Sequence, residues 1–141
     1  MCSPTMAIST GPRWRNSLRP VSSAQSGRPI QNTLFVENDA PGGSERSYNG
    51  LRLAGAIARR DGEVVKVFLM GDAASCAKAN QRVPAGFYNV ELMLQAVHRR
   101  GFEIGVCGTC MDARGIAETE LADGAKRGTL EQLTDWTLWA D

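Results

Sequence analysis

The chain has 141 residues, of which 43% are hydrophobic and 15 are glycine, as expected for one soluble domain with its own core. Its net charge of +1 is unevenly spread: residues 1–32 hold four arginines and no acidic residue, whereas residues 33–141 hold 12 basic and 15 acidic residues. An acidic body excludes a broad basic face for nucleic acid, and no apolar run is long enough to cross a bilayer.

Residues 1–31 are expected to form a disordered tail, because they are rich in Arg and Ser and poor in apolar residues. A single α/β domain is expected over residues 32–141. The tail has no apolar run suited to a secretory signal. We therefore expect a cytoplasmic protein with reactive rather than disulfide-bonded cysteines, since disulfides are rare in reducing compartments.

The first half of the domain predicts two strands joined by a helix. A short β-rich run, Thr33–Glu37, is followed by the turn-rich loop "NDAPGGSERS". Ser44 is the expected N-cap of an amphipathic helix that ends at Gly62. The next strand, Glu63–Gly71, is almost continuously apolar, which is typical of a strand covered on both faces.

The second half continues the alternation. Its expected elements, in order, are a short helical piece over residues 72–81, a Pro84–Gly86 turn, a helix capped by Asn89 and ending at Gly101, a strand over Phe102–Gly108, short helical segments over residues 111–128, and a last helix capped by Thr129. Strands that alternate with helices favour a parallel sheet with helices on both faces.

Parallel sheets place ligands beyond the carboxyl ends of their strands. Three segments fall there: "NDAPGGSERS", "GDAASCAK" and "CGTCMDARG". Asn38 and Asp72 each follow a strand, so either can orient a substrate or simply cap a helix.

Two cysteines three residues apart follow the last predicted strand. Cys107 ends that strand and Cys110 begins the next helical turn. A helix N-terminus and Cys-X-X-Cys spacing both lower a cysteine pKa. Gly108 allows a tight turn between the sulfurs, and Arg114 can add positive charge. The pattern favours a nucleophilic thiolate with a resolving thiol beside it.

Four interpretations of the pair remain open: two buried hydrophobic residues, a zinc site, a thioredoxin-like dithiol, and a sulfur-carrying nucleophile. A zinc site could draw on Cys76 and His98, but a second CxxC or His pair is missing. The dithiol lacks its partnering proline, since no proline follows Pro84. Cys76 follows the second strand and is either a further sulfur acceptor or resolving thiol, or a packed small residue.

Three motifs in order, "FVENDAPGGSERSYNGLRLA", "VFLMGDAASCAKANQ" and "CGTCMDARGI", resemble the DsrE/DsrF/TusD-like sulfur-relay family, and more narrowly its DsrE-like branch with CGTC. The resemblance covers residues 32–141. It implies a flavodoxin-like α/β fold, assembled as homo-trimers or hexamers. It also implies that Cys107 is the active cysteine, with Arg114 and Gly115 as the Arg-Gly pair that follows it.

The chain departs from that family in two respects. Several characterised carriers have no thiol at Cys110, and some have none at Cys76, which leaves room for a dithiol function. Members usually continue into a final apolar strand, whereas this sequence stops at "WTLWAD". A sheet without that strand is expected to leave an open edge and to expose Trp136 and Trp139.

These observations together predict a sulfur carrier, of sulfurtransferase type if it is an enzyme. Cys107 is expected to hold sulfane sulfur as a persulfide, and Cys110 to act as the resolving thiol. The alternative is a redox-responsive binding module without sulfur transfer. Expected partners are further copies of the chain and sulfur donor and acceptor proteins or small thiols, with no cofactor, metal, nucleic acid or membrane.

Overall fold

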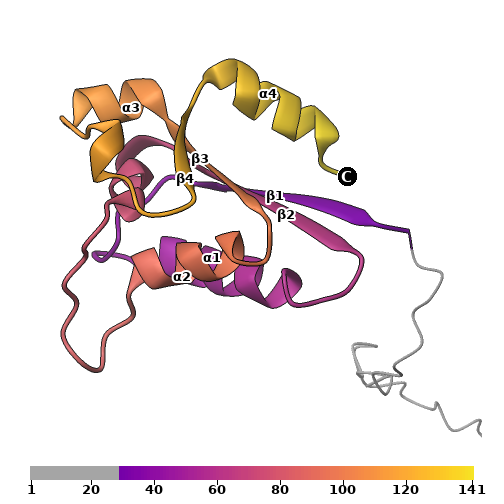
Figure 1. Ribbon diagram of the computed structural model, residues 1–141, viewed down its shortest axis with the longest axis horizontal. Helices are drawn as coiled ribbons and strands as arrows, with labels where there is room; N and C mark the ends of the chain where they lie inside the picture. Colours follow the sequence, from indigo (N-terminus) through magenta and orange to yellow (C-terminus); the bar gives the residue numbers. More distant parts are fainter. Residues whose placement is uncertain (1–28) are drawn as a thin grey trace, which may run out of the picture.

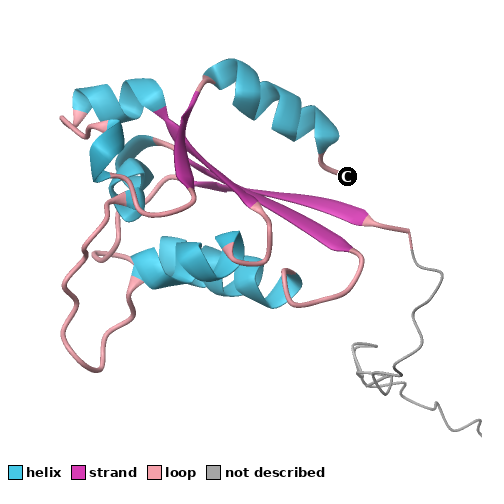
Figure 2. Ribbon diagram, viewed as in Figure 1, coloured by secondary structure: helices cyan, strands magenta, loops and turns pink. Residues whose placement is uncertain are grey.

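The computed structural model describes residues 29–141, so nearly all of the predicted tail lies outside the described part. Its centre is a four-stranded, wholly parallel sheet in the order β1-β2-β3-β4, drawn in magenta in Figure 2. The strands are β1 (Gln31–Glu37), β2 (Glu63–Leu69), β3 (Glu103–Cys107) and β4 (Ala125–Gly128). The predicted fold class is confirmed.

Helices cover both faces of this sheet (Figure 1). Two helices, α1 (Arg46–Ile57) and α2 (Val90–His98), pack together under one face, and α4 (Leu130–Trp139) lies on the other. At the carboxyl ends of the strands lie the 3₁₀ helix η1 (Gly71–Ala77) and the short helix α3 (Gly108–Ala113), and a second 3₁₀ turn, η2 (Glu118–Glu120), precedes β4. The predicted caps Asn89 and Thr129 accept backbone hydrogen bonds from the first turns of α2 and α4.

The side chains of β2 alternate between two apolar layers, as a pleated strand requires. Val65, Val67 and Leu69 are fully buried in the larger core under α1 and α2. Phe68 points the other way, toward Leu133 and Trp136 of α4. The charged Lys66 shares that second face, where its Nζ lies 4.9 and 4.4 Å from the ring centroids of the two α4 tryptophans.

Two glycines make the second layer possible. Phe68 meets Trp136 edge to face, with ring centroids 5.8 Å apart. A Cβ atom on Gly105 would lie 2.8 Å from the Phe68 ring and 3.2 Å from Trp136, and one on Gly128 would lie 3.0 Å from Phe68. Only glycine at these strand positions lets α4 approach the sheet this closely.

Three expectations are wrong. The segment over residues 125–128 is a strand rather than helical, because its backbone pairs with β3 from Ile104–Ala125 to Cys107–Gly128. Ser44 is not the N-cap of α1. Glu45 takes that position, and the Ser44 hydroxyl donates to Asp39 and accepts only a long bond, 3.5 Å, from the Arg46 N–H. Trp136 is only 6% exposed, since α4 folds back over the sheet.

Among residues 29–141, none of the helices combines the length and the apolar character needed to cross a bilayer.

Candidate active site

The CxxC motif lies where the carboxyl ends of β2 and β3 meet. Cys107 is the last residue of β3 and the N-cap of α3, while Cys110 lies in the first turn of that helix. The chain leaves the neighbouring strand β2 and enters η1 at Gly71. The two cysteines therefore stand at the edge where parallel sheets collect their functional groups.

The sulfur of Cys107 is half-buried and receives several hydrogen bonds. The Cys110 backbone N–H donates to Cys107 Sγ at 3.4 Å, and the Thr109 hydroxyl lies 3.3 Å from it. Partial burial works against ionisation of this thiol, but hydrogen bonds from the Cys110 and Thr109 side chains and backbones outweigh it and lower the pKa of Cys107. These hydrogen bonds favour the thiolate form of Cys107, which is the form that attacks.

Cys110 has the opposite character. Burial is the largest cause of its raised pKa, and hydrogen bonding between its side chain and Cys107 raises the pKa further. The Gly71 N–H and the positive charge of Arg114 lower the pKa and only partly offset this rise. The Gly71 N–H donates to Cys110 Sγ at 3.2 Å. Both cysteines are free, so the pair combines a thiol of lowered pKa with a neighbour of raised pKa.

Arg114 joins the two elements that carry this site. Its guanidinium bonds to Asp72 Oδ1 of η1 at 2.6 and 3.3 Å and to the Cys110 carbonyl at 3.1 Å. Two of the predicted supporting residues thus meet in an ion pair that ties η1 to α3. Asn38 contributes through its backbone, since its carbonyl accepts from the Ala73 N–H of η1 at 3.2 Å.

Arg127, on β4, is a site residue that the sequence did not reveal. Its guanidinium forms two parallel bonds to Asp112, at 2.8 and 2.7 Å. A Cβ atom on Gly108 would lie 2.8–3.0 Å from that guanidinium, so a side chain at this position would push Arg127 away from where it now lies. Only the strand pairing of β4 places this arginine beside Cys107.

Cys107 and Cys110 line a pocket of about 400 Å³ on the α4 face of the sheet. Its other walls are Phe68, Met70, Gly108, Thr109, Arg127, Gly128, Thr129 and Leu130. The reactive sulfur therefore faces a space that a small molecule or a side chain can enter.

Cys76 occupies a different environment. It is completely buried in the core under α1 and α2, where its thiol donates to the Asp39 carbonyl at 3.4 Å. Burial, more than any other influence, raises the pKa of Cys76 to about 12. A thiol that is enclosed and protonated has the surroundings of a packed small residue rather than of a sulfur acceptor.

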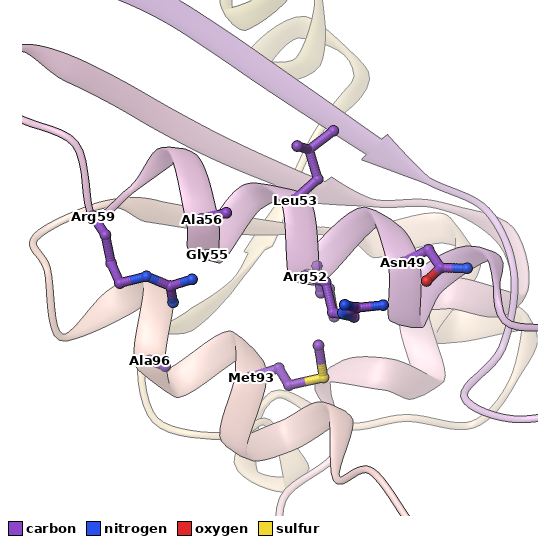
Figure 3. Close-up of a pocket in the computed structure, with 9 residues that line it drawn as sticks. Asn49, Arg52, Leu53, Gly55, Ala56, Arg59, Met93 and Ala96 are labelled. Carbon is purple, nitrogen blue, oxygen red and sulfur yellow. The ribbon is translucent and has the colours of Figure 1, made fainter. Parts of the chain in front are cut away.

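A larger groove, of about 510 Å³, lies between α1 and α2 and is flanked by Arg52 and Arg59, with Met93 facing them (Figure 3). This groove is on the opposite face of the sheet from Cys107, and none of the predicted site residues lines it. Within residues 29–141, no group of three or more His, Cys, Asp and Glu side chains is placed to hold a metal ion.

Comparison with known proteins places the chain in a family. The DsrE/DsrF-like family matches residues 31–141. Protein YchN of Escherichia coli is 39% identical over 79% of this chain and 96% of its own length, and its crystal structure superimposes with a TM-score of 0.75. Uncharacterized proteins of Methanopyrus kandleri and Methanocaldococcus jannaschii are 35% and 37% identical over 75% of this chain and 86% and 91% of theirs. The chain belongs to the DsrE/DsrF-like family.

Proposed function

We propose that this protein is a sulfur carrier that holds sulfane sulfur as a persulfide on Cys107. The observation that carries the proposal is the contrast between the two neighbouring sulfurs. Cys107 has a lowered pKa, borders an open pocket and accepts a hydrogen bond from the Cys110 N–H, whereas Cys110 has a raised pKa. Membership of the DsrE/DsrF-like family supports a role in sulfur relay.

Loading begins with attack by the Cys107 thiolate on the outer sulfur of a donor persulfide, R–S–SH. A bond forms between Cys107 Sγ and that outer sulfur while the donor's S–S bond breaks. The donor leaves as the thiolate R–S⁻, and Cys107 becomes Cys107–S–SH. Hydrogen bonds from the Cys110 N–H and the Thr109 hydroxyl favour the reactive thiolate form of Cys107 before the attack.

Cys110 offers a route for releasing the sulfur. Its thiol gives up its proton and attacks Cys107 Sγ, which breaks the S–S bond of the persulfide and yields a Cys107–Cys110 disulfide and H₂S. The sulfane sulfur is reduced and the two cysteines are oxidised. Two molecules of a small thiol then restore the dithiol by exchange. The raised pKa of Cys110 delays this step and favours a persulfide that lasts long enough to be passed on.

Intact mass spectrometry tests the proposal directly. After incubation with a persulfide donor, the protein should gain about 32 Da per sulfur, and Cys107→Ser should gain nothing. Cys110→Ser should keep the added mass longer, because internal release is blocked. An adduct that forms normally in Cys107→Ser would exclude the role proposed for Cys107.

The closeness of the two cysteines, with the Cys110 N–H 3.4 Å from Cys107 Sγ, also favours a second candidate, a redox-responsive module without sulfur transfer. That function predicts a reversible Cys107–Cys110 disulfide with a defined potential and no stable persulfide. Titration of the dithiol against glutathione, with the mass measurement above, separates the two candidates.

The trimer or hexamer implied by the family resemblance remains a prediction. Three apolar side chains on the α4 side of the molecule, Val36, Leu130 and Leu138, are 41%, 71% and 80% exposed, which is consistent with association through that side. Sedimentation velocity at several protein concentrations measures the assembly directly.

A further inference from the structure

The pocket beside Cys107 has mainly apolar walls. Phe68 and Met70 form its floor on the sheet, and Leu130, in the first turn of α4, forms part of its rim. Gly108 and Gly128 line it without side chains, which leaves a space of about 400 Å³ next to the reactive sulfur. A volume of this size lies within the range of small-molecule sites.

The one charged side chain that lines this pocket is already paired. Both Nη atoms of Arg127 donate to Asp112, at 2.8 and 2.7 Å, and its Nε lies 3.9 Å from Glu118. A ligand carboxylate would have to share the guanidinium with these two acidic residues, which repel it. A ligand ammonium would find no carboxylate among the residues that line the pocket. A charged ligand would therefore lose hydration and gain, at most, a share of an arginine that already has acidic partners.

We propose that this pocket binds the apolar substituent of a small, uncharged thiol, which accepts the sulfur from Cys107 in preference to a charged thiol such as glutathione. The proposal rests on the proposed persulfide of Cys107 and names its acceptor class. The apolar walls favour an apolar substituent, and the lack of an unpaired charge disfavours ionic groups. Because Cys107 lines the pocket, a molecule bound there lies beside a reactive sulfur, as a thiol acceptor must.

The transfer is balanced without any other reactant. The acceptor thiolate, R–S⁻, attacks the outer sulfur of Cys107–S–SH. The new bond gives R–S–SH, the old S–S bond breaks, and Cys107 is released as a thiolate. With R in the apolar pocket, the acceptor sulfur is held beside the outer sulfur of the persulfide, which raises the rate through proximity.

The experiment measures transfer from the loaded protein to alkanethiols of similar pKa and increasing length, which are propanethiol, butanethiol and pentanethiol. The more acidic thiols 2-mercaptoethanol and glutathione are used for comparison, and every rate constant is expressed per thiolate. Each added methylene should raise the second-order rate constant about two- to fourfold until the pocket is full, and glutathione should be slower than butanethiol. Equal rate constants along the series, or a faster reaction with glutathione, would overturn the proposal.

The chain offers a matched pair of variants on one helix. Leu130 borders the pocket, whereas Leu138, which is similarly exposed, does not line it. Leu130→Gln should lower the rate with pentanethiol roughly three- to tenfold and have a much smaller effect with 2-mercaptoethanol. Leu138→Gln should change neither rate. Equal effects of the two substitutions would refute the assignment of this pocket.

A second readout keeps this inference separate from the sulfur-carrier function. Cys107 is alkylated in the unloaded protein with iodoacetamide, N-benzyl iodoacetamide and the anion iodoacetate, and the modified peptide is quantified by mass spectrometry. The benzyl reagent should react fastest and iodoacetate slowest, whether or not a persulfide forms. If no persulfide forms but this order holds, the carrier function fails and the apolar site stands. If loading succeeds but the order is reversed, the site assignment fails alone.

Discussion

The hydroxyl of Thr109 provides the most direct test of how the site activates Cys107. It lies 3.3 Å from Cys107 Sγ, and its hydrogen bond is one of those that lower the pKa of Cys107. Thr109→Val removes the hydroxyl but keeps the shape of the side chain, and Thr109→Ser removes a methyl group but keeps the hydroxyl. The two variants therefore separate hydrogen bonding from packing.

The expected magnitude follows from the exposure of this hydrogen bond. Hydrogen bonds to charged groups contribute about 1.5–3 kcal/mol. Because Thr109 is exposed, water can replace much of the hydroxyl's interaction, and the net loss of thiolate stabilisation should be about 0.5–1 kcal/mol. Since one pKa unit corresponds to about 1.36 kcal/mol, the pKa of Cys107 should rise by roughly 0.4–0.7 in Thr109→Val. Below the pKa, the thiolate fraction should fall about two- to fivefold.

The assay is the rate of alkylation of Cys107 by iodoacetamide as a function of pH, followed on the peptide that contains it. The thiolate is the reactive form, so the rate rises with pH through the pKa, and Thr109→Val should shift that rise to higher pH while the plateau stays the same. Thr109→Ser should follow the wild type. A Thr109→Val curve that coincides with the wild type would refute the assigned role of the hydroxyl.

Three further predictions concern stability. Gly105→Ala should lower the free energy of unfolding, measured in urea, by about 1–3 kcal/mol, because the new methyl group meets an aromatic ring of β2 at 2.8 Å. Gly55→Ala lies in the interior of α1 and has no contact nearer than 3.8 Å. This second substitution should raise the free energy of unfolding by about 0.5–1 kcal/mol. Burial raises the pKa of Glu37, so ionisation of this carboxyl in the folded protein opposes folding as the pH rises. Glu37→Gln should therefore stabilise the protein at pH 7. The gain in stability should vanish in thermal melts below pH 4.5, the ordinary pKa of that carboxyl. Asp72→Asn should cost about 0.2–1 kcal/mol in thermal unfolding at low salt, since its ion pair with Arg114 is largely exposed; a cost that does not shrink at 1 M salt would contradict this explanation.

The position of the cysteine pair could be predicted because it depends on local signals. An apolar run ends at Cys107 and a helix-compatible segment follows, so the sequence alone located the sulfurs at a strand end. Which sulfur has the lower pKa depends on the hydrogen bonds that Cys107 receives from Cys110 and Thr109. Residue types and spacing do not specify these contacts, because they depend on how the chain turns from β3 into α3.

The strand β4 could not be recognised from local sequence. Its four residues, "AKRG", contain no β-branched or aromatic residue, so their propensity does not favour a strand. Pairing with β3 determines the conformation instead. Because β4 was expected to be helical, Arg127 was not predicted as a site residue. An arginine in a predicted surface helix gives no reason to expect it beside a cysteine.

Cys76 illustrates a limit of periodicity arguments. The sequence placed it near the sheet edge but could not decide whether it pointed into the site or into the core. The segment is a 3₁₀ helix, which has three residues per turn rather than 3.6. The orientation of a side chain along such a turn differs from that in an α-helix, and here it directs the Cys76 thiol inward.

The location of α4 has a consequence for how the chain folds as it is synthesised. The helix lies over the sheet and contacts β1, about a hundred residues earlier in the chain. Until α4 has emerged from the ribosome, Leu34 and Phe68 are not buried, and the incomplete domain exposes an apolar, aggregation-prone surface. Nascent chains arrested just before Leu130 should therefore bind a holdase chaperone. Chains with a linker fused after Asp141, long enough for α4 to leave the ribosome, should lose that binding.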